Sequence, residues 1–313
     1  MLPGLPALVE KAQVSPWFNK LYENKTGRVR RDANSLNELL TKHNIYDCET
    51  ILNLQSEKGR KVFFMQAEMD VVSDGSDGDR MPSFDDYILK SSHFQPTTSY
   101  GWPKLTDKLN PVIPKLEQEL GEAREKLKAP KLTKEEKPIL TARVEEIPLL
   151  VADLKRRSYL VGQEDPFIVI PSSLRGYAGR NAWAPVIGDY AVVIYGNLLL
   201  PAVVGDYGPT TKVGEASLRI ARQLDPTASP YKRPVSDLKI TYLIFPGSAE
   251  PERKAPDYPA WRIRCQELIT KIGGLGGEAS LHEWEDRLEP KPGPAPEAIP
   301  AVTPPVPAGG PGQ

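Results

Sequence analysis

LLLPAVVGDYGPTTKVGEASLRIARQL, residues 198–224, is the stretch that decides the fold. Its apolar, partly β-branched beginning favours a buried strand. The Gly-Pro pair at 208–209 favours a turn, because proline lacks a backbone N–H and glycine permits positive φ. After Ser217, a helix-capping residue, apolar side chains recur at helical spacing. The pattern predicts that rigid elements hold two carboxylates, Asp206 and Glu215, nine residues apart.

Two interpretations of this pair of acids are open from spacing alone. In the first, they are the acid and base that cleave a glycosidic bond, a reaction that needs one protonated and one ionised carboxyl group across the scissile oxygen. In the second, Asp206 is an ordinary turn residue and Glu215 is a solvated acid near a helix start. The second arrangement is common, because turns favour Asp and the helix dipole favours acids.

The motif GDYGP followed by VGEASLRIA resembles the core motif of the chitosanases of glycoside hydrolase family 75. Further blocks of the same family occur in the same order: MDVVSDG (69–75), TTSY (97–100), PFIVIP (166–171), GDYAVV (188–193) and YLIFPGS (242–248). The resemblance covers roughly residues 61–100 and 159–248. It implies that the essential acids are Asp206 and Glu215, and that the chain is an enzyme.

The resemblance implies an endo-acting, inverting hydrolase of the β-1,4 bonds between glucosamine units. We assign Glu215 as general acid, since its apolar neighbour Val213 favours a desolvated, protonated carboxyl group, and Asp206 as general base. The reverse order stays open. Two other interpretations are another polysaccharide- or peptidoglycan-cleaving barrel and a non-catalytic glycan-binding or interaction module.

The acidic run at residues 70–79 follows an expected strand. An EF-hand loop counted from Asp70 would need an oxygen ligand at its third position and Glu at its twelfth, where this chain has Val72 and Met81. We therefore exclude this calcium loop. The run is either a solvated turn or a subsite for the ammonium groups of glucosamine.

The expected substrate-binding residues follow from the second interpretation of that run. Carboxylates of Asp70 and Asp74 would pair with sugar ammonium groups, and the hydroxyl groups of Thr98 and Ser99 would bind ring oxygens. Tyr207, beside the first catalytic acid, completes the expected set. We also expect Asp70 to converge with the two catalytic acids, although it lies far from them in sequence.

The chain of 313 residues has a formal net charge of −1, which argues against a general nucleic-acid binder. Attraction of a cationic polysaccharide would then come from a local cleft. Only two cysteines occur, Cys48 and Cys265, so a Cys-ligated zinc site is excluded, and their pairing is not implied. The three histidines lack metal spacing, and we expect no metal, no other cofactor and no membrane span. Oligomeric state stays open.

The first residues lack the basic region and apolar run of a secretory signal. The family resemblance nevertheless implies an extracellular enzyme. We expect either that a leader has been removed or that export follows another route.

We predict a mainly β protein with helical additions, an α+β fold built on a six-stranded barrel. The order of strand, acid, turn, second acid and helix also resembles double-psi β-barrels, by analogy. A catalytic domain is expected at 60–250, between an N-terminal segment (1–59) and a C-terminal helical segment (251–289).

Two further parts lie outside this expected core. Leucine-rich stripes at residues 105–157 predict an inserted helical hairpin, kinked at Pro148. It is either a self-packed protrusion, which we favour, or a partner-binding arm or lid. Residues 290–313 are rich in Pro, Ala and Gly and predict a disordered tail.

Overall fold

The computed structural model describes residues 1–35, 49–81, 83–91, 94–129, 132–231 and 235–288. Cys48 and the Pro-rich tail predicted at 290–313 therefore lie outside the described residues. Among the described helices, none is both long enough and apolar enough to cross a membrane.

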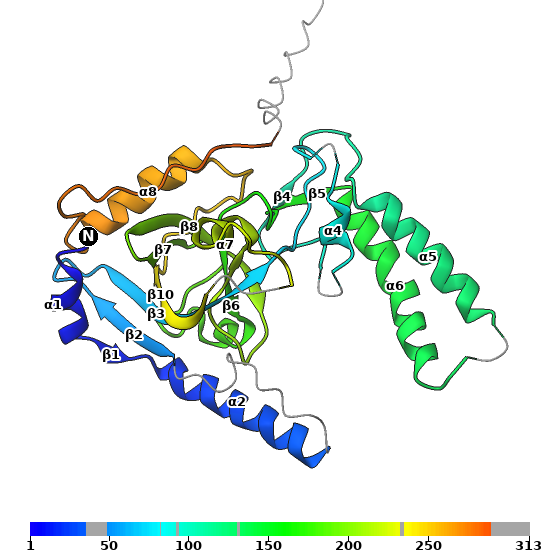
Figure 1. The fold of residues 1–313 in the computed structure, drawn as a ribbon, viewed down its shortest axis with the longest axis horizontal. Coiled ribbons are helices and arrows are strands. Elements are labelled where there is room, and N and C mark those ends of the chain that lie inside the picture. The colour runs from blue at the N-terminus through cyan, green and yellow to red at the C-terminus, as the bar shows by residue number, and fades with distance from the viewer. Residues whose placement is uncertain (36–48, 82, 92–93, 130–131, 232–234, 289–313) are drawn as a thin grey trace, which may run out of the picture.

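Six strands close into a mixed barrel at the centre of the molecule (Figure 1). In order around the barrel they are β3 (Lys61–Val72), β10 (Val235–Ile244), β7 (Tyr190–Tyr195), β8 (Leu198–Gly208), β6 (Phe167–Pro171) and β9 (Glu215–Ser217). The pairs β6–β8 and β3–β9 are parallel, and the other neighbours are antiparallel. The predicted α+β class and closed six-stranded barrel are confirmed, whereas the double-psi character stays a prediction.

Strands β6, β7 and β8 are largely apolar along their length, because both of their faces are covered. The buried side chains of the barrel strands form one core, which includes Phe167, Val204 and Tyr242. Helix α8 (Tyr258–Thr270) packs on β7 and β8 from outside, and α7 (Leu218–Leu224) follows β9 directly. The predicted cap of α7 is confirmed, since the Ser217 hydroxyl accepts a hydrogen bond from the backbone N–H of Ile220.

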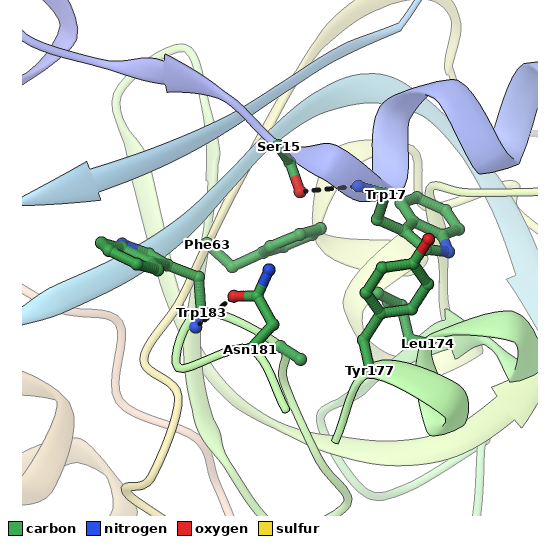
Figure 2. Close-up of a pocket in the computed structure, with 8 residues that line it drawn as sticks. Ser15, Trp17, Phe63, Leu174, Tyr177, Asn181 and Trp183 are labelled. Carbon is green, nitrogen blue, oxygen red and sulfur yellow. Dashed lines mark hydrogen bonds between the residues drawn. The ribbon is translucent and has the colours of Figure 1, made fainter. Parts of the chain in front are cut away.

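The N-terminal segment extends the sheet beyond the barrel and then crosses below it (Figure 1). The chain begins with the short helix α1 (Leu5–Glu10), which strand β1 (Gln13–Val14) follows. Strand β2 (Thr50–Gln55) pairs with β1 on one side and with β3 on the other. Ser15 caps helix α2 (Pro16–Asn34), as Figure 2 shows. In that view Trp17 lies against the 3₁₀ helix η1 (Ser172–Tyr177), where its indole N–H donates to the Ser173 hydroxyl at 3.0 Å.

The predicted helical hairpin is present and projects from one side of the barrel (Figure 1). It consists of α5 (Ile113–Leu127) and α6 (Glu136–Leu154), and α6 continues through Pro148. Strands β4 (Gly101–Pro103) and β5 (Arg157–Tyr159) pair with each other, so both ends of the hairpin meet at one place.

The base of the hairpin is not packed only on itself. Its apolar cluster includes Tyr159 of β5 and contacts Phe84 and Phe94, which flank the short helix α4 (Asp86–Leu89) and also pack against the barrel core. The hairpin is therefore joined to the barrel through shared aromatic side chains.

A buried arginine ties the end of the acidic run to the barrel. The guanidinium of Arg80 is 1% exposed, donates to Asp165 at 2.7 and 2.9 Å and also pairs with Asp77. Asp165 accepts further bonds from the backbone N–H of Val161 and the hydroxyl of Tyr258. These carboxylates belong to the framework, so the acidic run is neither wholly solvated nor wholly a sugar subsite.

We predict that Arg80→Ala lowers the free energy of unfolding by about 3–5 kcal/mol, because it leaves Asp77 and Asp165 as buried carboxylates without their cation. Urea unfolding measures the change. The matched control is Arg143→Ala on the hairpin, which breaks partly exposed pairs with Glu119 and Glu146 and should cost about 1 kcal/mol or less. Equal losses in the two variants would contradict a framework role for Arg80.

Candidate active site

The first acid, Asp206, lies within strand β8, so the interpretation of this acid as an ordinary turn residue does not hold. Strand β8 continues to Gly208, and its register against β6 shifts by one residue between Val204 and Asp206. Gly205 is the extra residue of this bulge, and a Cβ there would lie 2.6 Å from the ring of Phe167. A bulge redirects the side chains that follow it. Here it sets the direction of Asp206.

The carboxylate of Asp206 is held by three donors. Its Oδ1 accepts hydrogen bonds from the Ser99 backbone N–H at 2.9 Å, the Ser99 hydroxyl at 2.6 Å and the Tyr207 N–H at 2.7 Å. The Ser99 segment is attached to the same bulge, because the N–H of Tyr100 donates to the carbonyl of Gly205 at 2.9 Å. Ser99 therefore positions Asp206, in addition to any contact with sugar.

The second acid, Glu215, begins the short strand β9, between β3 and β6. It is the register partner of Asp70 on β3 and of Val169 on β6, and Val169 is in turn the partner of Asp206 on β8. The three acids thus lie in one row across four neighbouring strands. The expected convergence of Asp70 with Asp206 and Glu215 is present, and Asp70 is part of a strand, not of a loop.

The absence of a side chain at Gly208 leaves room for the Glu215 carboxyl group. A Cβ at Gly208 would lie 2.3 Å from Oε2 of Glu215 and 2.9 Å from Val169 Cγ1. Glu215 therefore reaches across β6 towards β8, the strand that carries Asp206. Its residue exposure is 9%, so the carboxyl group is largely withdrawn from water.

The electrostatic environment separates the two acids. Burial raises the pKa of Glu215 to about 7; Lys212 opposes this, and the nearby Asp70 and Asp206 add to it. Burial also raises the pKa of Asp206, but the donors on Ser99 and Tyr207 and the cation of Arg175 all favour its ionised form. Of these two groups, Glu215 is the one placed to hold a proton near neutral pH.

A third titratable acid faces the pair. Asp74 accepts a hydrogen bond from the backbone N–H of Gln95 at 2.9 Å. The pKa of Asp74 is raised to about 7, chiefly by burial; the charges of Asp206 and Glu215 contribute to this rise, and the hydrogen bond from Gln95 opposes it. Asp74 therefore lies within electrostatic reach of both acids, and its role in substrate binding stays a prediction.

Of the other two residues expected to bind substrate, Thr98 is buried and Tyr207 is partly exposed. Thr98 is buried, and its hydroxyl donates to the carbonyl of Tyr100 at 3.1 Å, so it faces into the protein. Tyr207 is partly exposed, and the guanidinium of Arg175 lies 4.0 Å from the centre of its ring.

Sequence reasoning missed two cations, Arg175 and Lys212. Arg175 is an exposed residue of η1, directly after β6, and influences Asp206. Lys212 lies between the two acids in sequence and forms an ion pair with Asp70 at 3.2 Å. Lys212 lies between the two blocks of the motif and could have been noticed. Arg175 carries no local signal, because only the fold brings η1 beside β8.

The profile of the family described as fungal chitosanase of glycosyl hydrolase group 75 matches residues 69–278. The chain belongs to this family of glycoside hydrolases. The match includes both acids, Asp70 and the whole barrel except the first part of β3, while α1, α2 and β2 precede it. No curated protein matches the chain. Membership of the chitosanase family implies hydrolysis of chitosan.

Because Gly208 leaves room for the Glu215 carboxyl group, we predict that Gly208→Ala lowers kcat of this chitosanase by about 100-fold, the order of loss caused by a displacement of about 1 Å. Gly121→Ala on α5 is the matched control, since a Cβ there meets nothing within 4 Å, and it should keep full activity. Circular dichroism should show both variants folded. Normal turnover by Gly208→Ala would contradict the close contact.

Proposed function

We propose that the chain is an endo-acting chitosanase that cleaves the β-1,4 bonds between glucosamine units with inversion. Glu215 is the general acid and Asp206 the general base. The observation that carries this proposal is the placement of the two acids in one row of the barrel, with Glu215 poised to hold a proton and Asp206 accepting hydrogen bonds that favour its ionised form. Family membership supplies the substrate class.

In the proposed reaction, Glu215 gives its proton to the glycosidic oxygen as the bond from that oxygen to the anomeric carbon breaks. A water molecule attacks the anomeric carbon from the opposite face, and Asp206 takes a proton from that water. The enzyme ends the cycle with Glu215 ionised and Asp206 protonated. Exchange with solvent restores both.

Inversion is proposed from the family resemblance, and the strand geometry sets only the backbone spacing from which the two acids reach towards each other. Asp206 and Glu215 are separated by β6, so their Cα atoms are two strand spacings apart, about 10 Å. An inverting enzyme needs room for a water between its carboxyl groups, which are roughly 6.5–9.5 Å apart in such enzymes. Acids on directly adjacent strands would start closer together.

The proposed substrate contacts follow from the exposed and charged groups around the pair. Asp70 and Asp74 are oxygen acceptors for the ammonium groups of glucosamine. Tyr207 offers a partly exposed ring beside Asp206, while Ser99 holds that acid through its hydroxyl and backbone N–H. The buried hydroxyl of Thr98 supports the same segment from inside.

We predict that Asp206→Asn and Glu215→Gln each lower the release of reducing ends from chitosan by at least about 100-fold, because each removes one proton-transfer step. Glu252→Gln is the matched control, since its side chain is 82% exposed and pairs only distantly with Lys254, and it should keep full activity. Full activity in both acid variants would remove the assignment.

The wild-type assay separates the finer parts of the proposal. Chitosan should be cleaved, whereas fully acetylated chitin and peptidoglycan should not. Early products of many lengths indicate endo action, and the α-anomer at the moment of release indicates inversion. Cleavage of peptidoglycan alone would place the chain with other glycan-cleaving enzymes.

We also predict that kcat falls as pH rises above about 7. Glu215 has a raised pKa of about 7, so it is protonated below that pH and loses its proton above it, and a general acid must be protonated. The rate on a saturating glucosamine hexamer should fall about tenfold for each pH unit on this limb. An alkaline limb already complete at pH 5 would show that Glu215 is ionised and not the acid.

A further inference from the structure

Lys212 is held in place by the turn that joins the two acids. The turn is fixed at its outer side by α2, where the amide of Asn24 donates to the carbonyl of Thr210 at 3.2 Å. At its inner end, the carbonyl of Gly214 accepts bonds from the Asp70 N–H at 2.8 Å and the Tyr242 hydroxyl at 3.1 Å. The turn therefore presents Lys212 to Asp70 from a supported backbone.

The Lys212 ammonium reaches into the acid row. Its Nζ lies 3.2 Å from Oδ2 of Asp70, and the two side chains are 22% and 12% exposed. The titratable groups that face Glu215 in this region are Lys212 itself, Asp70 on β3, Asp74 beyond β3, Asp206 on β8 and the Tyr242 phenol on β10. Within this set Lys212 is the cation.

The substrate carries the same functional group as this side chain. Lysine ends in a primary alkylammonium with three donors, and a glucosamine unit carries a primary ammonium on its ring. Both ammonium groups can donate a hydrogen bond to a carboxylate oxygen, and Asp70 is the carboxylate that accepts one from Lys212. An N-acetylglucosamine unit has no charge at that position and does not compete.

We propose that Lys212 is an internal counter-ion of Asp70 that competes with the ammonium group of the substrate and thereby limits the preference of the site for glucosamine over N-acetylglucosamine. This inference rests on the proposed chitosan-binding role of Asp70. A glucosamine unit displaces Lys212 from Asp70, exchanging one ammonium for another. A neutral unit leaves the internal pair intact, so acetylated positions along the polymer are tolerated.

The test compares two polymers of the same length, one fully deacetylated and one partly acetylated. Lys212→Met removes the competitor, so KM on the fully deacetylated polymer should fall roughly two- to fivefold, as expected for a partly exposed ion pair. On the partly acetylated polymer the fall should be smaller. Raising the salt concentration should reduce the difference, because these charges are screened.

Conservative variants and a remote lysine provide controls. Lys212→Arg keeps the charge and should keep most of the wild-type preference. Lys20→Met removes a lysine of the exposed Lys20–Glu23 pair on α2 and should change neither KM. Lys212→Gln removes the charge while keeping a polar side chain, and it serves if the methionine variant does not fold.

The pH profile gives a readout that a purely structural lysine would not change. Lys212 lowers the pKa of Glu215, so removing its charge should move the alkaline limb of kcat to higher pH, whereas Lys212→Arg should leave the limb near its wild-type position. A structural role predicts lower stability with an unchanged limb and an unchanged preference between the two polymers.

The outcomes separate this inference from the proposed function. If the wild-type enzyme does not hydrolyse chitosan, the proposed function fails. If the wild type is active but folded Lys212→Met and Lys212→Gln keep the wild-type ratio of KM values and the wild-type limb, only the counter-ion role is overturned. A rise in KM on the deacetylated polymer would also overturn it, because it would make Lys212 a substrate-binding group and not a competitor.

Discussion

Closure of the barrel by the three-residue strand β9 is the constraint on which the site depends. Glu215 begins this strand, which pairs in parallel with β3 on one side and antiparallel with β6 on the other. Pairing on both sides fixes the backbone of Glu215. Asp70 lies beside it on β3, and Asp206 lies on β8, beyond β6, so the pairings that close the barrel also bring the three acids together.

Placing several acids in one buried site is electrostatically unfavourable, and the structure compensates each acid differently. Isolated ionised carboxylates are very unfavourable away from water, and like charges oppose each other. Donors on Ser99 and Tyr207 stabilise the ionised Asp206, and Lys212 offsets the charge of Asp70. Glu215 avoids this cost in another way, since its raised pKa lets it keep a proton and stay uncharged. One protonated and one ionised carboxyl group are what acid–base catalysis needs.

Neighbouring acids of the same chain have a different role because their partners differ. Asp77 and Asp165 are fully buried around Arg80, and Asp79 accepts bonds from Leu105 and Thr106 at the start of the segment that leads to the hairpin. These acids hold the segments that support the site. The acidic run at 70–79 is thus divided between chemistry and framework, a division that its composition does not reveal.

The sequence by itself determined the apolar strands, the capped helix α7, the helical hairpin and the two acids, because each rests on a local pattern or on the order of the family's motifs. It left open whether Asp206 and Glu215 are a catalytic pair or a turn residue and a solvated acid near a helix start, and it expected Asp70 in an acidic loop after a strand. Only the tertiary structure decided that all three lie on barrel strands, since strand ends depend on pairing with distant segments. Only the tertiary structure places Arg175 near Asp206 and lets Ser99 donate hydrogen bonds to that acid, because these interactions join residues that are far apart in sequence.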